Sequence, residues 1–82
     1  MNVRVYVTPK EGILDPQGAT VERALPALGF QGVAAVRIGK FIEFRLEGGN
    51  LTWQQTHEQI DDMCRKLLAN PIIEDYRFEI DE

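Results

Sequence analysis

The sequence predicts an α+β protein in two layers, an antiparallel sheet with two helices on one face, in the order β-α-β(-β)-α-β. Both ends of the chain, residues 3–7 and 75–80, alternate apolar and polar side chains as half-buried strands do. Two other segments, residues 15–29 and 52–70, combine helix-end signals with an apolar stripe of helical spacing. A ferredoxin-like arrangement is the nearest template for this order, and we expect dimerisation to complete it.

The first strand is predicted over residues 3–7, where three valines share one side and Arg4 and Tyr6 share the other. The last strand follows the same rule, because residues 76, 78 and 80 are aromatic or aliphatic and their neighbours are charged. Each strand should therefore bury one face and leave the other in solvent. Glu74 shares parity with the apolar residues of the last strand, so it is the carboxylate to examine for a partner.

The first helix is predicted to begin after Asp15, whose side chain can cap the first turn, with Pro16 at the first helical position. Gly29 can adopt the left-handed conformation that ends a helix, so that Phe30 folds back onto the last turn. Pro26 lacks an N–H and should kink the helix or tighten its last turn. The segment is therefore a scaffold helix with one apolar stripe, formed by Val21, Ala24, Leu25 and Leu28.

Residues 33–46 form a long β-prone run that is compatible with two architectures. Gly39-Lys40 suits the two-residue loop of a hairpin, which would give a self-contained sheet. The same glycine also suits a bend in one long strand, which would reach out of one sheet into another. The second alternative favours a dimer built from shared strands, and the sequence leaves both open.

The second helix is predicted to begin at Thr52, which can form a capping box with Gln55, and to end at Asn70-Pro71. A turn at Gly48-Gly49-Asn50 precedes it. Trp53, in the first turn, is expected either to cover the edge of the core or to anchor a partner. The apolar stripe of this helix contains Ile60, Met63, Cys64 and Leu67.

The size and charge of the chain restrict its classes of function. Its 82 residues make one domain, residues 1–82, with a marginal core, so association with copies of itself or with larger partners is expected. The net charge of −4 and the scattered basic residues argue against a nucleic-acid partner. A single cysteine fits a reducing compartment. Without a signal-peptide pattern or an apolar span, we expect a soluble cytoplasmic protein with no membrane contact.

The residues that usually carry chemistry form no catalytic or metal-binding pattern. His57 is the sole histidine, whereas zinc needs three or four soft or imidazole ligands, so we expect a surface or structural role. Cys64 lies on the apolar stripe, which indicates a packed thiol. Most carboxylates fall on solvated faces, and the glycine loops that hold phosphates are absent. We therefore predict no catalytic, cofactor-binding or metal-binding residue.

Three blocks of the sequence stand in a distinctive order and spacing. They are residues 8–18 (TPKEGILDPQG) followed by Ala24-Leu25 and Leu28-Gly29-Phe30, residues 36–43 (VRIGKFIE), and residues 63–76 (MCRKLLANPIIEDY). Together the blocks resemble the PurS family, the small subunit of phosphoribosylformylglycinamidine (FGAM) synthase. The resemblance extends over nearly the whole chain, from residue 3 to about residue 80.

The resemblance implies a role in de novo purine synthesis, in which FGAM synthase converts formylglycinamide ribonucleotide, glutamine and ATP to formylglycinamidine ribonucleotide. In this family a PurQ-type glutaminase releases ammonia, and a PurL-type synthetase uses it with ATP and magnesium. PurS itself is expected to bind no cofactor and to perform no catalysis. It forms a homodimer or a larger assembly, brings the other two subunits together, and is thought to help ammonia pass between them.

Exposure and loop position suggest which residues contact partner proteins. Phe41 is a large apolar group on an otherwise polar side of its strand, which suits an interface, although an ordinary exposed aromatic residue is an equal alternative. The alternative to the assembly role is an ACT-like small-molecule-binding regulatory domain, which would need a ligand pocket at the dimer seam. The candidate contact residues are Lys10, Asp15, Gln17, Arg37, Lys40 and Phe41.

Overall fold

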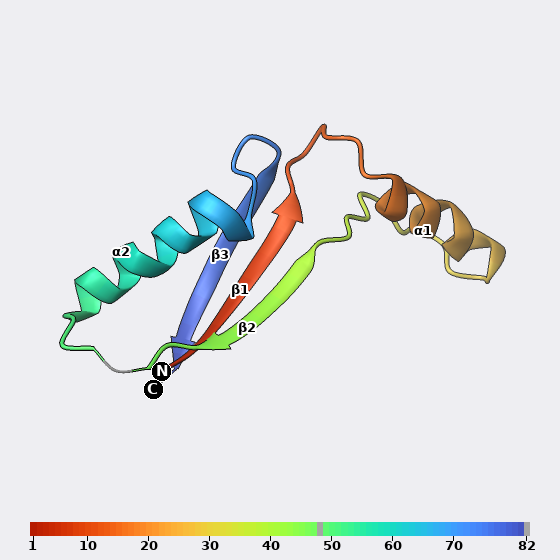
Figure 1. Ribbon diagram of the computed structural model, residues 1–82. Helices are drawn as coiled ribbons and strands as arrows, with labels where there is room; N and C mark the ends of the chain where they lie inside the picture. Colours follow the sequence, from red (N-terminus) through yellow and green to blue (C-terminus); the bar gives the residue numbers. More distant parts are fainter. Residues whose placement is uncertain (48, 82) are drawn as a thin grey trace.

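The computed structural model describes residues 1–47 and 49–81 and confirms the α+β class, with an antiparallel sheet and two helices (Figure 1). Gly48, part of the predicted turn at residues 48–50, lies outside the described residues, as does Glu82 of the predicted domain. A short π-helical segment, η1, continues the second helix. The elements are β1 (Asn2–Pro9), α1 (Pro16–Ala27), β2 (Lys40–Arg45), α2 (Trp53–Met63), η1 (Cys64–Leu68) and β3 (Glu74–Asp81).

The sheet has the strand order β2-β1-β3, and both pairings are antiparallel. In this register Val5 of the central strand lies opposite Ile42 of β2 and Phe78 of β3. Val3, Val5 and Val7 are almost completely buried, so the valine side predicted from the alternation faces the core. The side chains of opposite parity lie on the other face of the sheet, which no helix among the described residues covers (Figure 1).

The helix α2 lies across the valine face and supplies the other side of the core (Figure 1). Its predicted capping box is confirmed: the Thr52 hydroxyl accepts from the Gln55 N–H at 3.1 Å, and the Gln55 side chain accepts from the Thr52 N–H at 3.0 Å. Ile60 and Cys64 of the predicted stripe are buried. The helix ends in a π-type bond in which the Ala69 N–H donates to the Cys64 carbonyl at 2.8 Å.

Both predicted ends of α1 are confirmed. The Asp15 side chain accepts from a backbone N–H of the first turn at 3.1 Å. The last turn, which contains Pro26, is tightened, because the Leu28 N–H donates to the Leu25 carbonyl at 3.0 Å. Gly29 has φ 96°, and the Phe30 N–H returns to the Leu25 carbonyl at 3.1 Å, which completes a Schellman ending. The Phe30 ring nevertheless stays exposed.

The position of α1 differs from the prediction of two helices on one face of the sheet. Of the two helices, α2 covers the sheet, whereas α1 lies beyond the ends of the strands (Figure 1). The molecule is accordingly elongated, with extents of 53 × 25 × 15 Å. The predicted apolar stripe exists but contacts little of its own chain, since Leu28 is 71% exposed. Amphipathic spacing predicts that a helix has an apolar face, but it does not predict which surface packs against that face.

The path of residues 33–46 explains the position of α1. Only Lys40–Arg45 form a strand, and residues 33–39 run from α1 to β2 without turning back, so no hairpin forms at Gly39-Lys40 among the described residues. At Gly39 a β-carbon would lie 1.9 Å from the Val7 carbonyl oxygen, so only glycine permits this close passage. The chain thus leaves its own sheet, as in the second alternative, although not as one continuous strand.

Candidate functional site

Residues 10–39 form an arm that stands off the sheet and consists of a loop, α1 and the return segment (Figure 1). Two carboxylates join its halves: Asp15 accepts from the Ile38 N–H at 2.9 Å, and Glu22 accepts from the Val36 N–H at 2.9 Å. The Ile38 N–H, with a second one from the first turn of α1, holds the pKa of Asp15 below its ordinary value. The helix and the return segment are therefore held together as one unit.

Two contacts fix the base of the arm to the sheet. The Arg37 guanidinium donates to the carbonyl of Pro9, the last residue of β1, at 2.9 Å. The Lys10 ammonium pairs with the Asp75 carboxylate of β3 at 2.8 Å. Both contacts are exposed, so they orient the arm more than they stabilise the fold.

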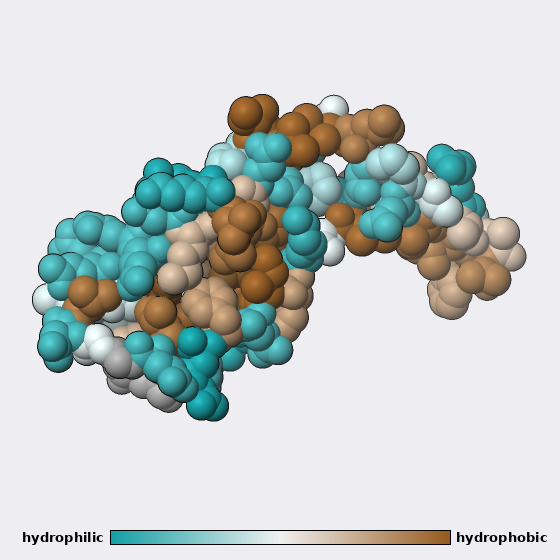
Figure 2. Space-filling view, viewed as in Figure 1, coloured by the Kyte–Doolittle hydropathy of each residue, from teal (hydrophilic) through white to brown (hydrophobic). Residues whose placement is uncertain are grey.

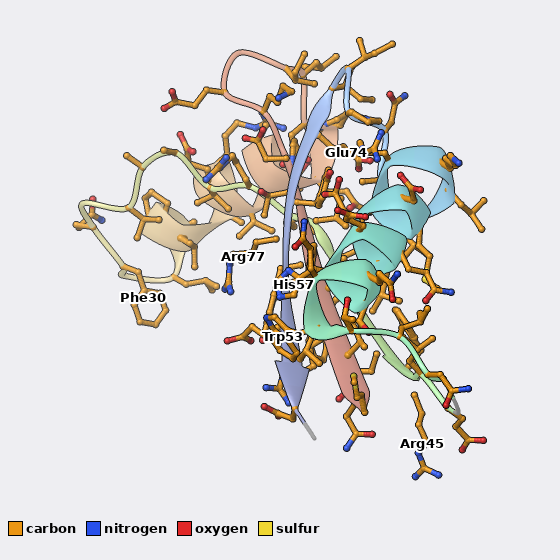
Figure 3. The ribbon with its side chains drawn as sticks, turned by 90° about the vertical axis from the view of Figure 1, so that its left-hand side faces the viewer. Phe30, Arg45, Trp53, His57, Glu74 and Arg77 are labelled. Atoms are coloured by element: carbon orange, nitrogen blue, oxygen red, sulfur yellow. The ribbon has the colours of Figure 1, made fainter. Side chains whose placement is uncertain are left out.

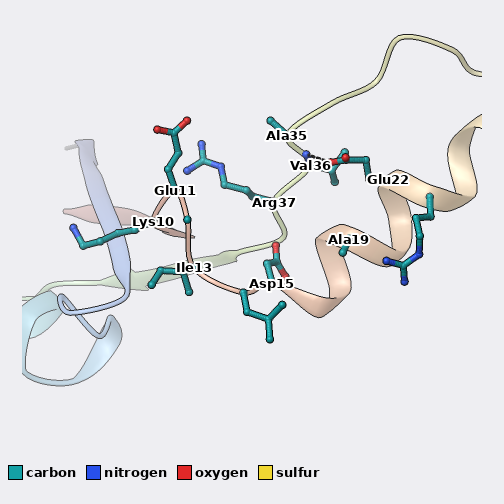
Figure 4. A pocket seen from close by; sticks show the side chains of 12 residues that line it. Lys10, Glu11, Ile13, Asp15, Ala19, Glu22, Ala35, Val36 and Arg37 are labelled. Atoms are coloured by element: carbon teal, nitrogen blue, oxygen red, sulfur yellow. Dashed lines mark hydrogen bonds between the residues drawn. The ribbon is translucent and has the colours of Figure 1, made fainter.

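A polar hollow lies between the loop at residues 10–15, α1 and residues 35–37 (Figure 4). Positive and negative groups are equal in number there, so the hollow has no excess charge with which to hold an ion. Several of these groups are already engaged in the bonds that shape the arm. The charged residues that line it are Lys10, Arg23 and Arg37 with Glu11, Asp15 and Glu22.

An apolar groove runs between β2 and the helical layer, on the side of α2 that faces β2. Figure 2 shows the hydrophobic side chains that gather there. Leu67 of the predicted stripe is 83% exposed at this groove rather than buried, because the π turn of η1 changes the helical phase after Cys64. The outer edge of β2 is unpaired within the described residues. The apolar lining consists of Ile42, Phe44, Leu46, Met63, Leu67 and Leu68.

A second groove lies on the opposite side of α2, against β3. The Trp53 ring lies 4.8 Å from the His57 ring, which lies 5.3 Å from the Phe78 ring of β3. Figure 3 shows Trp53 and His57 beside β3. His57 is half-buried in this stack, as expected for a structural role, whereas Trp53 is 55% exposed and covers His57 rather than the valine core.

The groove against β3 is bounded further along α2 by a polar cluster. Asp61 accepts hydrogen bonds from the Tyr76 hydroxyl at 2.6 Å and from Arg65 at 2.9 Å. The Tyr76 bond is the main cause that lowers the pKa of Asp61, and the same bond raises the pKa of Tyr76 to about 12. Asp61 is therefore held ionised, and the bond fastens α2 to β3.

The uncovered face of the sheet carries a stack of aromatic and cationic groups. The Tyr6 ring lies 5.1 Å from the Phe41 ring, and the Arg77 guanidinium lies 3.9 Å from the centre of the Tyr6 ring. The Tyr6 hydroxyl donates to Glu79 at 2.6 Å, which raises the pKa of Tyr6 and lowers that of Glu79. Phe41 remains 54% exposed at the edge of this stack.

The six predicted contact residues do not form one surface. Gln17 lies on another side of α1, beside Ile38, and Lys40 and Phe41 belong to β2. Their contact with partner proteins stays a prediction. Sequence reasoning did not place the two grooves, because each needs the helical layer and a strand in register. Three of the six line the polar hollow, namely Lys10, Asp15 and Arg37.

The other residues that could bind a metal or act as a nucleophile lie in surroundings typical of structural roles. Within the described part of the chain, no three His, Cys, Asp or Glu side chains are placed to hold a metal ion together. Cys64 is buried, and burial raises the pKa of its thiol, which disfavours the thiolate. Glu74, the carboxylate singled out for examination, accepts a hydrogen bond from the Asn70 N–H at 2.7 Å. No helix described here has both the length and the apolar character needed to cross a membrane.

The family model and the related sequences that match this chain all belong to one family. The family model PurS, described as phosphoribosylformylglycinamidine (FGAM) synthase, matches residues 2–82. The PurS subunit of that synthase from Bacillus subtilis is 45% identical over 80 residues, which are 98% of this chain and 92% of the relative. The PurS subunit from Synechocystis is 48% identical over 77 residues, which are 94% of this chain and 75% of the relative.

Solved structures agree with the sequence comparison. PurS from Bacillus subtilis superposes with a TM-score of 0.82 at 44% identity, covering 99% of this chain and 98% of that one. A chain of the PurLQS structure from Thermotoga maritima gives a TM-score of 0.79 at 29% identity, covering 95% and 93%. This evidence decides against the ACT-like alternative, and the chain belongs to the PurS family of FGAM synthase subunits.

Proposed function

We propose that this chain is a non-catalytic assembly subunit of FGAM synthase in the cytoplasm, where it holds a PurL-type synthetase and a PurQ-type glutaminase together in de novo purine biosynthesis. The observation that carries the proposal is the similarity to PurS over residues 2–82, together with a family member that stands in a PurLQS structure. ATP and magnesium would be bound by the synthetase subunit.

The mechanism would be geometric. Ammonia released by a glutaminase into bulk water is diluted and protonated, whereas ammonia released beside the synthetase site reacts at a high effective concentration. A small rigid subunit that fixes the relative pose of the two enzymes assists this transfer without any group that reacts. The interaction surfaces of the described residues, and the structural surroundings of Cys64 and His57, support such a role.

The assembly subunit would act as a homodimer. Two features of the chain are complementary, so that one feature of one copy can pack against the other feature of a second copy. The arm presents an unburied apolar stripe on α1, and the body presents an unburied apolar groove beside β2. Because the arm points away from its own groove, the arm of one copy can fill the groove of the other (Figure 1). A two-fold axis makes this exchange reciprocal.

The return segment supplies the strand that the second copy needs. Residues 33–38 run beside α1 and are joined to it through Asp15 and Glu22. The segment is as long as β2 (Lys40–Arg45), whose outer edge is unpaired within the described residues. Laid against that edge, it would complete the predicted ferredoxin-like order with elements from two chains, and would protect an edge that otherwise invites aggregation.

The dimer proposal is tested by one pair of substitutions. Leu67, in the groove, and Ile72, in the turn before β3, are both 83% exposed in the isolated chain. Leu67→Glu should convert the dimer to monomer because it places a carboxylate under the partner's arm, whereas Ile72→Glu should leave the dimer intact. Analytical ultracentrifugation measures both. A Leu67→Glu variant that stays dimeric would rule out the groove as the dimer contact.

The assembly role is tested by reconstitution from purified subunits. The synthetase and glutaminase should co-elute in size-exclusion chromatography only when this chain is present, and glutamine-dependent turnover should depend on it in the same way. If the two enzymes associate and use glutamine at full rate without this chain, the assembly role is wrong.

A further inference from the structure

We propose that the groove between α2 and β3 is the docking site for an arginine side chain of one of the larger subunits. This inference rests on the proposed assembly function and names the surface and the chemistry through which it works. The groove is separated by α2 from the apolar groove that the second copy would fill. Its lining residues are His57, Glu58, Asp61, Asp62, Arg65 and Phe78.

The floor of the groove is aromatic. His57 and Phe78 line the groove with their ring centroids 5.3 Å apart, and Trp53, outside the lining, packs on His57 at 4.8 Å. This packing fixes the orientation of the rings before any partner arrives. Aromatic rings are contacted well by a planar guanidinium, which is weakly hydrated and stacks on them.

The rim of the groove is acidic. Three carboxylates and one guanidinium line it. Asp62 is already paired with Arg65 and Lys66. Asp61 is already bound to Tyr76 and Arg65, and its lowered pKa keeps it charged. Glu58 differs, because its side-chain contact is the Gln54 amide at 3.3 Å, an exposed and neutral partner. Glu58 is therefore the carboxylate best able to form a bidentate pair with an incoming guanidinium.

The exposed Trp53 makes an arginine more suitable than a lysine. Trp53 is 55% exposed at the mouth of the aromatic stack and stands at the first position of α2. Tryptophan and arginine are the residues that most often dominate protein–protein contacts, and a guanidinium can stack and pair at the same time. A lysine ammonium would pair with the rim but lose hydration over the rings.

Nuclear magnetic resonance can locate the docking event, because Trp53 is the sole tryptophan of the chain. The chain labelled with 5-fluorotryptophan gives one fluorine resonance, which is titrated with the unlabelled synthetase and, separately, with the unlabelled glutaminase. We expect one of the two subunits to shift or broaden this resonance. A complex that forms and leaves the resonance unchanged would overturn the inference.

A matched pair of charge reversals tests the role of the rim. Glu58→Lys should weaken binding of that subunit by about tenfold, whereas Glu47→Lys, the same change outside the groove, should alter it by less than about twofold. Glu58→Lys should still fold, because residue 58 is exposed and a lysine there faces Asp62 one helical turn away. Equal affinities for the two variants would overturn the inference.

A photo-crosslinker at position 58 identifies the partner residue directly. The cross-linked peptide should contain an arginine, and replacing that arginine with glutamate should restore binding to the Glu58→Lys variant. A cross-linked segment without arginine, or a failed restoration, would refute the proposed chemistry while the assembly role stands. If the unaltered chain forms no complex with either subunit, the proposed function fails as well.

Discussion

The hydrogen bond between Tyr76 and Asp61 should be a measurable part of the stability of the fold. It joins α2 to β3 at 2.6 Å and is partly buried, and it connects residues 15 positions apart in the sequence. Tyr76→Phe removes the hydroxyl and leaves the ring in place. Asp61 keeps its bond to Arg65, so the variant should fold.

The magnitude follows from the kind of bond. A hydrogen bond to a charged group contributes about 1.5–3 kcal/mol when buried, and partial exposure of this pair reduces the expected loss to about 1 kcal/mol. For a chain of 82 residues this corresponds to a decrease in melting temperature of roughly 4–8 °C. The comparison must be made at one protein concentration, because dimerisation would make the melting temperature depend on it.

The pH dependence has a definite sign. The pKa of Asp61 in the folded state lies below its unfolded value of about 3.9. The contribution is therefore complete above about pH 4 and is lost as the pH falls through the lower folded value. Thermal melts of the two proteins should differ at pH 7 and converge in acid. At high pH, the absorbance difference between the two proteins should report a phenol with a pKa of about 12.

The control variant loses the same tyrosine hydroxyl from a more exposed hydrogen bond. Tyr6→Phe removes a hydroxyl that donates to Glu79, also at 2.6 Å, on the uncovered face of the sheet. Because water replaces an exposed partner easily, its effect on the melting temperature should be smaller. Equal losses for the two variants, or a Tyr76 phenol that titrates near 10, would contradict the reasoning.

Three further outcomes follow from single residues. The amide proton of Ile38 should titrate in nuclear magnetic resonance with a midpoint below the ordinary pKa of aspartate, and Asp15→Asn should abolish that step. Cys64 should react with a thiol reagent in denaturant and resist it in the native state, and fast native reaction would show that α2 is loosely packed. Gly39→Ala should destabilise the fold by well over about 1 kcal/mol in denaturant titrations, because its β-carbon would meet the Val7 carbonyl.

Local structure in this chain could be predicted because its signals are local. Asp15 caps α1, Thr52 and Gln55 form the capping box, and Gly29 takes the left-handed conformation. Each of these features depends on backbone groups within a few residues, which the sequence displays directly. The alternation of β1 likewise places its valines in the core, since one face of a strand must be buried.

The placement of the elements could not be predicted in the same way. The stripe on α1 specifies an apolar face, yet the surface that would bury it is not part of the local sequence. The π turn at Cys64 shifts the helical phase, so Leu67 leaves the predicted stripe for the groove. The stack of His57 on Phe78 depends on the distance between α2 and β3, which only the tertiary structure fixes.

The internal bonds of the arm bear on why an exchanged dimer would be stable. An arm that had to order itself on binding would lose conformational entropy of about 1–2 kcal/mol for each residue fixed. Here Asp15 and Glu22 already hold the return segment against α1, and Arg37 holds the base against Pro9. The helix and the strand segment are therefore already arranged as the second copy would bind them. Less of the free energy gained from apolar contact is then lost to ordering the arm. Loss of these carboxylates should weaken the dimer although neither need touch the partner.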